Sequence, residues 1–578
     1  MLKKLWNRVR EYKKASLLSP LYVTLEVIME VLIPFFMADI LDVGIANGDM
    51  PYIIKIGLFL MIAAIMSLVF GVLSGHYAAI ASAGFAKNLR KDMFHNIQNF
   101  SFSNIDKFST ASLVTRLTTD ITNVQNAYQM IIRILVRGPI MLVFALVMSM
   151  TINLELSLIF LVAIPVLAIG LVIIILKAHP HFETVFRRYD RLNSIVQENL
   201  TGVRVVKAYV REEHEIEKFH EISQDVYNRF KMAEKIIAFN SPFMQFVMYT
   251  CILLLSWLGA EVMVSNIMTT GQLMSMIVYA TQILGSLMML SMVFVMIILA
   301  KASAGRIVEV LEEESDLKNE SNPIETVKDG EILFQNVNFS YVKEQEKLAL
   351  EGIYLHIKSG ETVGIIGGTG SAKTSLVQLI PRLYDVTSGS IKIGGVDVRE
   401  YDIETLRNEV AMVLQKNVLF SGTIKENLRW GQKNASEEEL IRACQLAQAD
   451  DFIKSFPDGY DTRLDQGGTN VSGGQKQRIC IARALLKKPK ILILDDSTSA
   501  VDTKTDAMIR KAFKEEIPNT TKIIIAQRIS SVEDADKIIV LDHGKIEAIG
   551  ISQELLQTSK IYKEVYDSQV KGVNKNDQ

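Results

Sequence analysis

Apolar and polar positions divide this chain into two unlike halves. Up to about residue 300, six segments are apolar over a length that crosses a bilayer, which requires roughly 20 helical residues. The expected spans are 17–44, 52–85, 129–152, 155–178, 240–265 and 271–300. From "GEILFQNVNFSY" onward, short β-type runs alternate with helical ones, as in an α/β domain with a mainly parallel sheet. We therefore expect an all-α six-helix membrane domain over 17–310 and an α/β domain over 329–568.

The segments that flank these two domains are amphipathic or polar. Within 1–16, Leu2, Leu5, Val9 and Tyr12 fall on one helical face, which favours a helix lying on the inner membrane surface. The acidic stretch "VLEEESDLKNESNP" ends the membrane domain and opens a linker over 311–328. A polar tail is expected over 569–578.

The connections between spans predict the orientation in the membrane. "IANGDMP", "NLE" and "SNIMTTG" are short and lack Lys and Arg, whereas 86–128 and 179–239 are long and rich in both. Because positively charged connections stay in the cytoplasm, we expect both termini and the α/β domain there. The protein is thus expected to be a multi-pass protein of the cell membrane, in contact with the lipid bilayer.

Composition narrows the choice of function. A net charge of −2 over 578 residues, 49% of them hydrophobic, argues against a nucleic-acid-binding protein. The three cysteines, Cys251, Cys444 and Cys480, lack metal-ligand spacing and are expected to pack in a reducing compartment.

Glu26 and Glu30 lie one helical turn apart inside the first span. Carboxylates are costly in a membrane and by default indicate a functional site, here one that attracts cationic substrates to a central cavity. The structural alternative is that they bond a neighbouring helix or reach toward the inner interface.

The stretch "VGIIGGTGSAKTSL" carries the strongest chemical signal. An apolar strand, a glycine-rich loop and a helix follow one another, so backbone N–H groups point at phosphate oxygens. Lys373 is expected to reach the β- and γ-phosphates of ATP, and the Thr374 hydroxyl to bind Mg²⁺. Ala372 replaces the usual glycine before the lysine and is acceptable if its φ is negative, so ATP binding should survive. The expected ATP-binding residues here are Gly367, Gly368, Thr369, Gly370, Ser371, Ala372, Lys373, Thr374 and Ser375.

Further residues stand where an ATP site needs them. Tyr341 could stack on adenine, and Gln415 could contact the metal or the attacking water. In "ILILDDSTSAVD", Asp495 ends a buried strand and is expected to hold the Mg²⁺ shell. Asp496 follows in the place of the catalytic base.

"VSGGQKQR", from Val471 to Arg478, resembles the signature motif of ABC transporters. The order of the motifs and the six spans before them resemble the half-transporter layout of type IV ABC exporters over nearly the whole chain. This resemblance implies a dimer in which each ATP lies between one chain's Walker motifs and the other's signature. It assigns contacts with the ATP-binding domains to stretches near 103–110 and 201–208. It also assigns the trans-acting signature to Val471, Ser472, Gly473, Gly474 and Gln475, and the D-loop to Ser499 and Asp502.

Two residues depart from the family pattern in one catalytic site. Asp496 replaces the usual glutamate, and Gln527 replaces the usual histidine. Aspartate is one methylene shorter, and glutamine carries no positive charge, so the site should bind ATP and hydrolyse it slowly. The pattern resembles the degenerate-site subunit of bacterial heterodimeric multidrug exporters. It implies a non-identical partner half-transporter with the intact glutamate and histidine, and lipophilic substrates, cationic ones included.

Three alternatives stay open from the sequence. Asp496 could act as the base in a homodimer, the chain could be a homodimeric lipid or peptide flippase, or it could be a regulatory ATP-binding membrane module.

Overall fold

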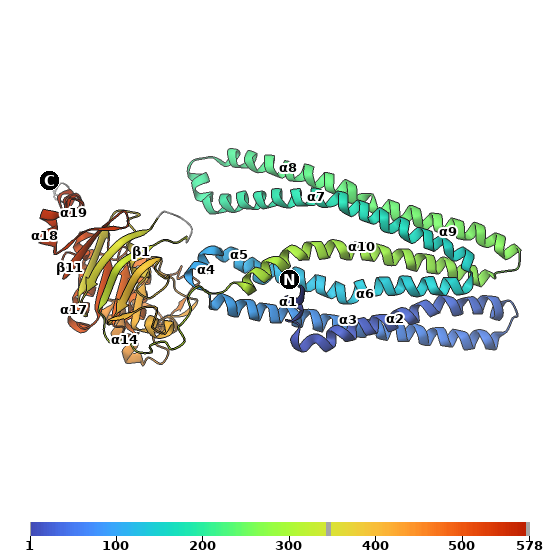
Figure 1. The fold of residues 1–578 in the computed structure, drawn as a ribbon, viewed down its shortest axis with the longest axis horizontal. Coiled ribbons are helices and arrows are strands. Elements are labelled where there is room, and N and C mark those ends of the chain that lie inside the picture. Colours follow the sequence, from blue (N-terminus) through green and yellow to red (C-terminus); the bar gives the residue numbers. More distant parts are fainter. Residues whose placement is uncertain (1, 343–347, 574–578) are drawn as a thin grey trace. The chain divides into compact units, whose positions relative to one another are not determined.

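The computed structural model describes residues 2–342 and 348–573 and separates them into two compact units (Figure 1). The helical unit contains Met1–Gln98 and Thr110–Glu313. The ATP-binding unit contains Asn99–Ser109 and Glu314–Gln578. The predicted membrane and α/β domains are thus present, except that an eleven-residue piece of the first half belongs to the second unit.

Six helical stretches of the described chain are long and apolar enough to cross a membrane, which confirms the predicted number. They are formed mainly by α2 (Lys13–Asp39), α3 (Met50–Gln98), α6 (Ile121–Ile152), α7 (Leu154–Ala208), α9 (Asn240–Val264) and α10 (Thr270–Glu312). At 1.5 Å per residue, the 49 residues of α3 are roughly 70 Å long, more than twice the hydrocarbon thickness. Such helices continue far beyond the membrane.

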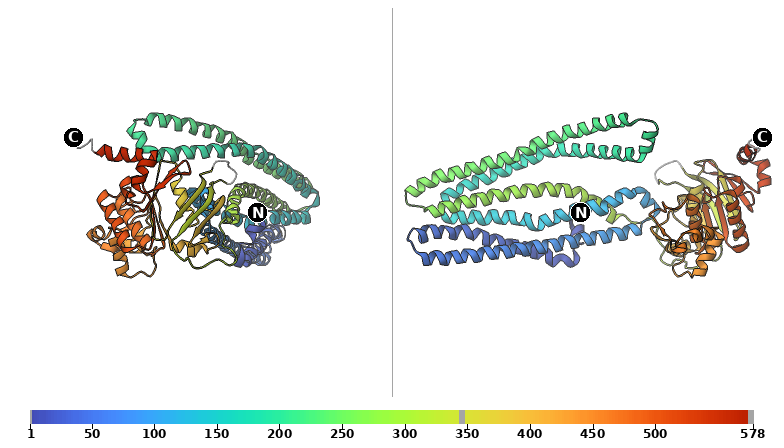
Figure 2. Two further views of the ribbon diagram at one scale, coloured as in Figure 1. Left: turned by 60° about the vertical axis from the view of Figure 1, so that its left-hand side comes forward. Right: turned by 180° about the vertical axis from the view of Figure 1, so that it is seen from behind.

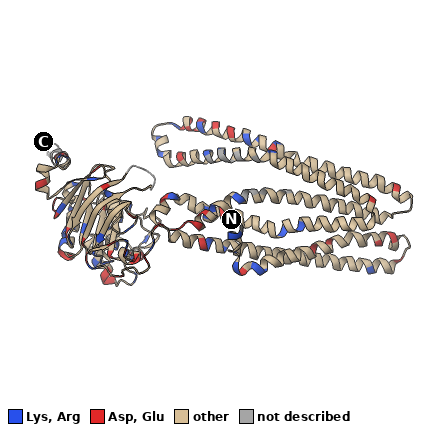
Figure 3. Ribbon diagram, viewed as in Figure 1, with Lys and Arg blue, Asp and Glu red and all other residues tan. Residues whose placement is uncertain are grey.

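The other helices of this unit are α1 (Leu2–Trp6), α5 (Thr110–Thr115) and α8 (Glu212–Ala238). Two π-helical segments, Ile40–Ile45 and Arg116–Asp120, interrupt the long helices. α8 continues end to end into α9, and both run beside α7; the end of the α7–α8 pair stands apart from α6 and α10 (Figure 2). Lys, Arg, Asp and Glu gather along α8 and are sparse along α9 (Figure 3).

The helix expected over 1–16 is not continuous. α1 ends at Trp6, a 3₁₀ turn covers Arg10–Tyr12, and α2 has begun by Lys13. Val9 is fully buried, and Arg10 has a positive φ of 46° that breaks the helix. Asp92 of α3 accepts hydrogen bonds from both Arg8 and Arg10, at 2.6 and 3.0 Å. The basic residues therefore fasten this segment to α3.

The ATP-binding unit is built on a six-stranded sheet in the order β12-β11-β3-β10-β9-β6. Strands β11, β3, β10, β9 and β6 are parallel, as predicted, and β12 is antiparallel to β11. An antiparallel sheet, β2-β1-β4-β5, and the two-stranded β7-β8 were not foreseen. The strands are β1 (Ile332–Phe339), β2 (Leu350–Ile357), β3 (Thr362–Gly367), β4 (Ser388–Ile393), β5 (Val396–Asp397), β6 (Val410–Val413), β7 (Gly422–Thr423), β8 (Arg463–Leu464), β9 (Ile491–Asp495), β10 (Thr521–Ile525), β11 (Lys537–Asp542) and β12 (Lys545–Gly550).

Both faces of the parallel sheet are covered, one by α14, α16 and α17 and the other by α11 and the antiparallel sheet, which is why its strands are apolar at nearly every position. Successive residues of β3 serve different cores: Ile365 packs with Phe334 of the antiparallel sheet, whereas Ile366 packs with Ile481 of α16. The helices are α11 (Lys373–Gln378), α12 (Ile403–Glu409), α13 (Ile424–Leu428), α14 (Glu437–Leu446), α15 (Asp450–Ser455), α16 (Gly473–Leu485), α17 (Thr503–Glu516), α18 (Ser552–Thr558) and α19 (Lys560–Val573).

The polar tail was expected to begin at residue 569, but the helix before it extends further. α19 continues to Val573, and only residues 574–578 of that stretch lie outside the described chain. The predicted linker, by contrast, is non-helical beyond Glu312 and packs on its own unit, since Ile324 pairs with Tyr401 and Val327 is 3% exposed.

The piece Asn99–Ser109 carries helix α4 (Phe102–Lys107), which overlaps the stretch 103–110 expected to contact the ATP-binding domain. The Tyr384 hydroxyl donates a 2.6 Å hydrogen bond to Asp106, and the Phe102 ring lies 6.0 Å from the Tyr384 ring. Asn104 donates to the Glu314 carbonyl at 3.1 Å. α4 is therefore a built-in part of the ATP-binding unit.

Candidate functional site

The glycine-rich loop between β3 and α11 is shaped by close backbone contacts. A Cβ on Gly367 would lie 2.2 Å from the Leu541 carbonyl oxygen, so only glycine fits there. Gly370 has a φ of +82°, a conformation that glycine adopts without strain. The strand–loop–helix context predicted for phosphate binding is therefore present.

Ala372 departs from the sequence-based expectation. Its φ and ψ are 68° and 27°, in the left-handed region, and not at the negative φ on which tolerance was argued. A residue with a Cβ pays about 1–2 kcal/mol there, which glycine avoids. The loop thus keeps the shape that suits glycine and carries a strained alanine in it.

Lys373 opens α11 and folds back over the loop. Its ammonium donates to the Gly367 and Gly368 carbonyls, both at 2.8 Å, and to the Ser371 hydroxyl at 3.3 Å. Burial lowers the pKa of Lys373, and the charges of Asp495 and Asp496 oppose this shift. The cation is thereby held where phosphate oxygens approach the loop.

Thr374 and Asp495 lie together, as predicted for a Mg²⁺ site. The Thr374 hydroxyl donates to Asp495 Oδ1 at 3.1 Å, and Asp495, at the end of β9, is 2% exposed. Its Oδ2 is buried and accepts no hydrogen bond from the described residues. Burial raises the pKa of Asp495, while the Thr374 bond opposes the shift. A buried, orphaned carboxylate oxygen beside a hydroxyl fits Mg²⁺, which takes few protein ligands and completes its shell with water and phosphate.

The two unusual residues of the catalytic site touch each other. Gln527 Nε2 donates a 2.8 Å hydrogen bond to Asp496 Oδ2. Asp496 has a positive φ of 49°, which aspartate tolerates better than most residues. Burial raises the pKa of the Asp496 carboxyl, and hydrogen bonds from Gln527 and Gln415 oppose the shift. The carboxylate in the position of the base is thus engaged by the amide that replaces histidine.

Gln415 lies two residues beyond the end of β6, which closes at Val413. It is near enough to Asp496 to oppose the rise that burial causes in the pKa of that carboxyl.

Tyr341 follows β1 and is about half exposed. Its hydroxyl and that of Ser375 are 2.8 Å apart, and its ring lies 5.2 Å from the Tyr384 ring, edge to face. Burial raises the pKa of Tyr341. The Tyr341 hydroxyl therefore lies beside Ser375, at the start of the helix that follows the glycine-rich loop.

The signature residues form the start of α16. Ser472 caps this helix in a capping box with Gln475: Ser472 N donates to Gln475 Oε1 at 2.9 Å, and Gln475 N to Ser472 Oγ at 3.3 Å. Ser472 and Gly473 are exposed, whereas Val471 and Gly474 are half-buried, with Gly474 against Ala500. The hydroxyl and the first N–H groups of α16 are thus available at the surface.

The D-loop residues have bonds within the chain. Ser499 Oγ donates to the Asp496 carbonyl at 3.0 Å. Asp502 caps α17 by accepting a 2.9 Å hydrogen bond from Thr505 N, and this backbone bond holds the pKa of Asp502 below its usual range. Asp502 therefore has a structural task in addition to any role across a dimer.

Three residues that sequence reasoning missed support this site. Arg528 donates to the Ser499 and Val501 carbonyls, both at 3.1 Å. Gln477 of the signature helix accepts from Ala500 N at 3.1 Å. Gln569 of α19 donates to the Gln527 carbonyl at 2.8 Å and accepts from Ile529 N at 2.9 Å. Gln477 lies inside the quoted stretch Val471 to Arg478, and Arg528 directly follows Gln527, whereas no sequence motif contains Gln569.

In the helical unit, Glu26 and Glu30 of α2 both pair with Arg137 of α6. Arg137 donates to Glu26, and a second guanidinium nitrogen lies 2.6 Å from Glu30. Both carboxylates therefore bond to a neighbouring helix, as the structural alternative expected. One net negative charge remains in the group when all three residues are ionised.

Comparisons with known proteins agree with this architecture. A family model described as "ABC transporter transmembrane region" matches residues 17–287, and one described as "ABC transporter" matches residues 350–499. The uncharacterized ABC transporter ATP-binding protein YfiB of Bacillus subtilis (strain 168) is 39% identical over 568 residues, 98% of each chain. The ATP-dependent lipid A-core flippase of Desulfotalea psychrophila is 31% identical over 98% of this chain and 99% of its own. The structure of a bacterial Atm1-family ABC exporter with ATP bound has the same fold, with a TM-score of 0.82 at 24% identity, and the match covers 97% of this chain and 98% of that one.

Proposed function

Since this chain belongs to the ABC transporter family and couples ATP hydrolysis to transport across a membrane, we propose that it is the weakly hydrolytic subunit of a heterodimeric exporter. Its partner is a second, non-identical half-transporter that retains the catalytic glutamate and histidine. The pair resides in the cell membrane, with both termini and the ATP-binding domain in the cytoplasm.

One observation carries this proposal, the hydrogen bond from Gln527 to Asp496. A general base must reach the attacking water within hydrogen-bond distance. The Asp496 carboxylate is one methylene shorter than glutamate and already accepts from Gln527. A misplacement of about 1 Å can cost on the order of 10²-fold in rate. Slow hydrolysis at this chain's own site follows.

The rest of the machinery supports ATP binding at that site. Lys373, Thr374 and Asp495 would hold the phosphates and Mg²⁺, which would supply charge neutralisation at the phosphates when bound. Tyr341 would contact the adenine. The exposed capping box of Ser472 and Gln475 leaves the signature able to complete the partner's site. The two ATP sites of the dimer would then hydrolyse ATP at different rates. ATP bound at either site would help to dock the two ATP-binding domains.

For the transported substrate we propose lipophilic compounds, including cations. The apolar spans suit lipophilic molecules, and the group of Arg137, Glu26 and Glu30 carries one net negative charge when all three residues are ionised. Lipid transport is the second candidate, favoured by the 31% identity with a lipid A-core flippase over nearly the whole chain. Vesicle assays with a lipophilic cation and with a labelled lipid separate the two.

The first test compares ATP hydrolysis by this chain alone, by the chain together with a second half-transporter, and by the double variant Asp496→Glu, Gln527→His. Activity only in the mixture, lost when the partner's catalytic glutamate is replaced, is the expected result. The double variant should gain activity alone, whereas the control Asp458→Glu, at an exposed position outside the site, should not. Full activity from the unaltered chain alone would contradict the proposal.

A further inference from the structure

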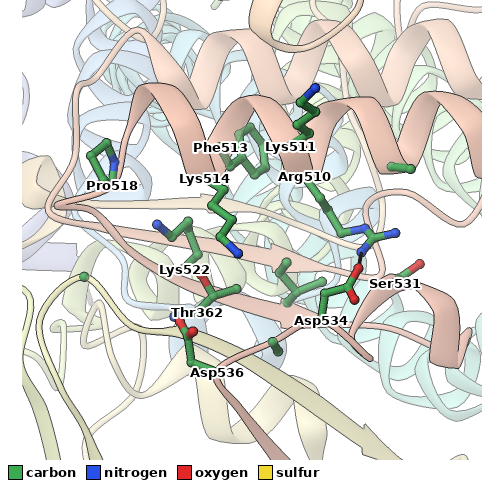
Figure 4. A pocket seen from close by; sticks show the side chains of 14 residues that line it. Thr362, Arg510, Lys511, Phe513, Lys514, Pro518, Lys522, Ser531, Asp534 and Asp536 are labelled. Carbon is green, nitrogen blue, oxygen red and sulfur yellow. Dashed lines mark hydrogen bonds and ion pairs between the residues drawn. The ribbon is translucent and has the colours of Figure 1, made fainter. Parts of the chain in front are cut away.

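A cavity lies in the ATP-binding unit at the amino ends of β3 and β10 (Figure 4). Its volume is about 620 Å³, and its walls are α17 and the segments that enter β3, β10 and β11. The glycine-rich loop follows the carboxyl end of β3, so the parallel strands separate the two places. The cavity is therefore distinct from the ATP site.

A buried lysine forms part of its wall. Lys522, the second residue of β10, is 3% exposed, and its ammonium donates to the Ile517 carbonyl at 3.2 Å. An ammonium group has three N–H donors, and no second acceptor for it is present among the described residues. Burial lowers the pKa of Lys522, and the charge of Asp536 opposes the shift. A buried lysine without full hydrogen bonding gains from an anion beside it.

Lys514 extends from α17 into the same cavity, as Figure 4 shows. Within the described part of the chain its ammonium has neither a hydrogen-bond acceptor nor an ion-pair partner. Arg510, one turn earlier on α17, lies 3.3 Å from Asp506 and from Asp534. Its Nε makes no hydrogen bond of good geometry despite the closeness of Asp506.

The acidic residues of the cavity are already engaged. Asp536 accepts a 2.8 Å hydrogen bond from Thr362 N, and Asp534 pairs with Arg510. Four basic residues, Arg510, Lys511, Lys514 and Lys522, line the cavity against these two acidic ones, and Lys511 also lies 3.9 Å from Glu515, which is outside the lining. Donors therefore exceed acceptors, which is the chemistry of an anion site.

We propose that this cavity binds a small phosphate-bearing molecule, with Lys514 and Lys522 on the phosphate. The volume leaves room for a second phosphate or for the organic part of a phosphate ester. The cavity also adjoins the catalytic elements. α17 begins directly after its capping residue, the D-loop residue Asp502, and Asp506 accepts a buried 2.9 Å bond from Ser531, four residues beyond Gln527. A bound anion can therefore act on the position of the D-loop.

The test uses the full chain carrying Lys373→Ala, which removes phosphate binding at the glycine-rich loop. Sodium pyrophosphate and glycerol 3-phosphate are titrated separately by calorimetry, since one is a free inorganic anion and the other a headgroup-type ester. We expect at least one to bind, and Lys514→Ala to weaken that binding about tenfold or more, because a charge-assisted hydrogen bond is lost. The matched control is Lys504→Ala, an exposed lysine of α17 outside the cavity, which should leave the affinity unchanged.

Lys522→Met is the second variant, accompanied by a thermal unfolding curve to show that the chain is folded. The proposal is overturned if neither anion binds the Lys373→Ala chain. It is equally overturned if Lys514→Ala leaves the affinity unchanged, or if Lys504→Ala weakens binding as much as Lys514→Ala does.

Discussion

Replacing Ala372 by glycine should stabilise the ATP-binding unit, although removing a methyl group normally does the opposite. Ala372 has a φ of 68°, which costs about 1–2 kcal/mol for a residue with a Cβ. Glycine removes that cost but gives the unfolded chain more freedom, worth about 0.4–1 kcal/mol. The methyl group is half-buried against the core, which subtracts a few tenths more. A net gain of about 0.5 kcal/mol remains.

Thermal unfolding of the purified chain measures this difference. For a unit of this size, about 1 kcal/mol corresponds to roughly 2–4 °C in Tm, so Ala372→Gly should raise Tm by about 1–2 °C. The matched control is Ala507→Gly in the exposed part of α17, where glycine costs about 1 kcal/mol and should lower Tm by about 2–4 °C.

A third variant tests whether the positive φ of Ala372 causes the change in Tm. Ala372→Val places a β-branched side chain at a positive φ, where such residues are outliers, and should lower Tm. If Ala372→Gly instead lowers Tm as much as Ala507→Gly does, the left-handed geometry imposes no cost and the reasoning is wrong.

Three other perturbations follow from the contacts described. Asp495→Asn should raise Tm at pH 7 and abolish Mg²⁺-dependent hydrolysis; because burial raises the pKa of Asp495, the gain in Tm should shrink as pH falls and the native carboxyl becomes protonated. Arg137→Ala should lower Tm in detergent more than Glu30→Gln does, since it leaves two carboxylates unpaired between helices; equal losses would contradict this. Tyr384→Phe should weaken the stimulation of ATP hydrolysis by substrate while preserving the fold. The double variant Tyr384→Phe, Asp106→Asn should lose little more coupling than Asp106→Asn alone, because both changes affect one hydrogen bond.

The sequence was informative where a few neighbouring residues determine the structure. The strand, loop and helix around Gly367 and Lys373 lie within one short stretch, so their geometry follows from local patterning. The φ of Ala372 was not predictable, because it depends on the backbone path that the loop takes beside β11. Likewise, the Asp496–Gln527 bond joins residues 31 positions apart. It required knowing that β9 and β10 are neighbours.

Contacts between distant segments were beyond the sequence pattern. Arg137 and Glu26 are 111 positions apart, and their pairing depends on which helices pack together. The role of Gln569 depends on α19 continuing past the point where composition indicated a tail. The six spans, in contrast, were predictable because the requirement for apolar length acts on each helix separately.

The assignment of Asn99–Ser109 to the ATP-binding unit affects how that unit can be prepared alone. A soluble fragment starting at residue 314 would lack α4 and leave the hydroxyl of Tyr384 without Asp106, the Tyr384 ring without Phe102, and the Glu314 carbonyl without Asn104. ATPase activities measured on such a fragment would come from a protein in which the surface normally covered by α4 is exposed to solvent. Adding α4 back as a synthetic peptide, or fusing it through a flexible linker, would restore that surface.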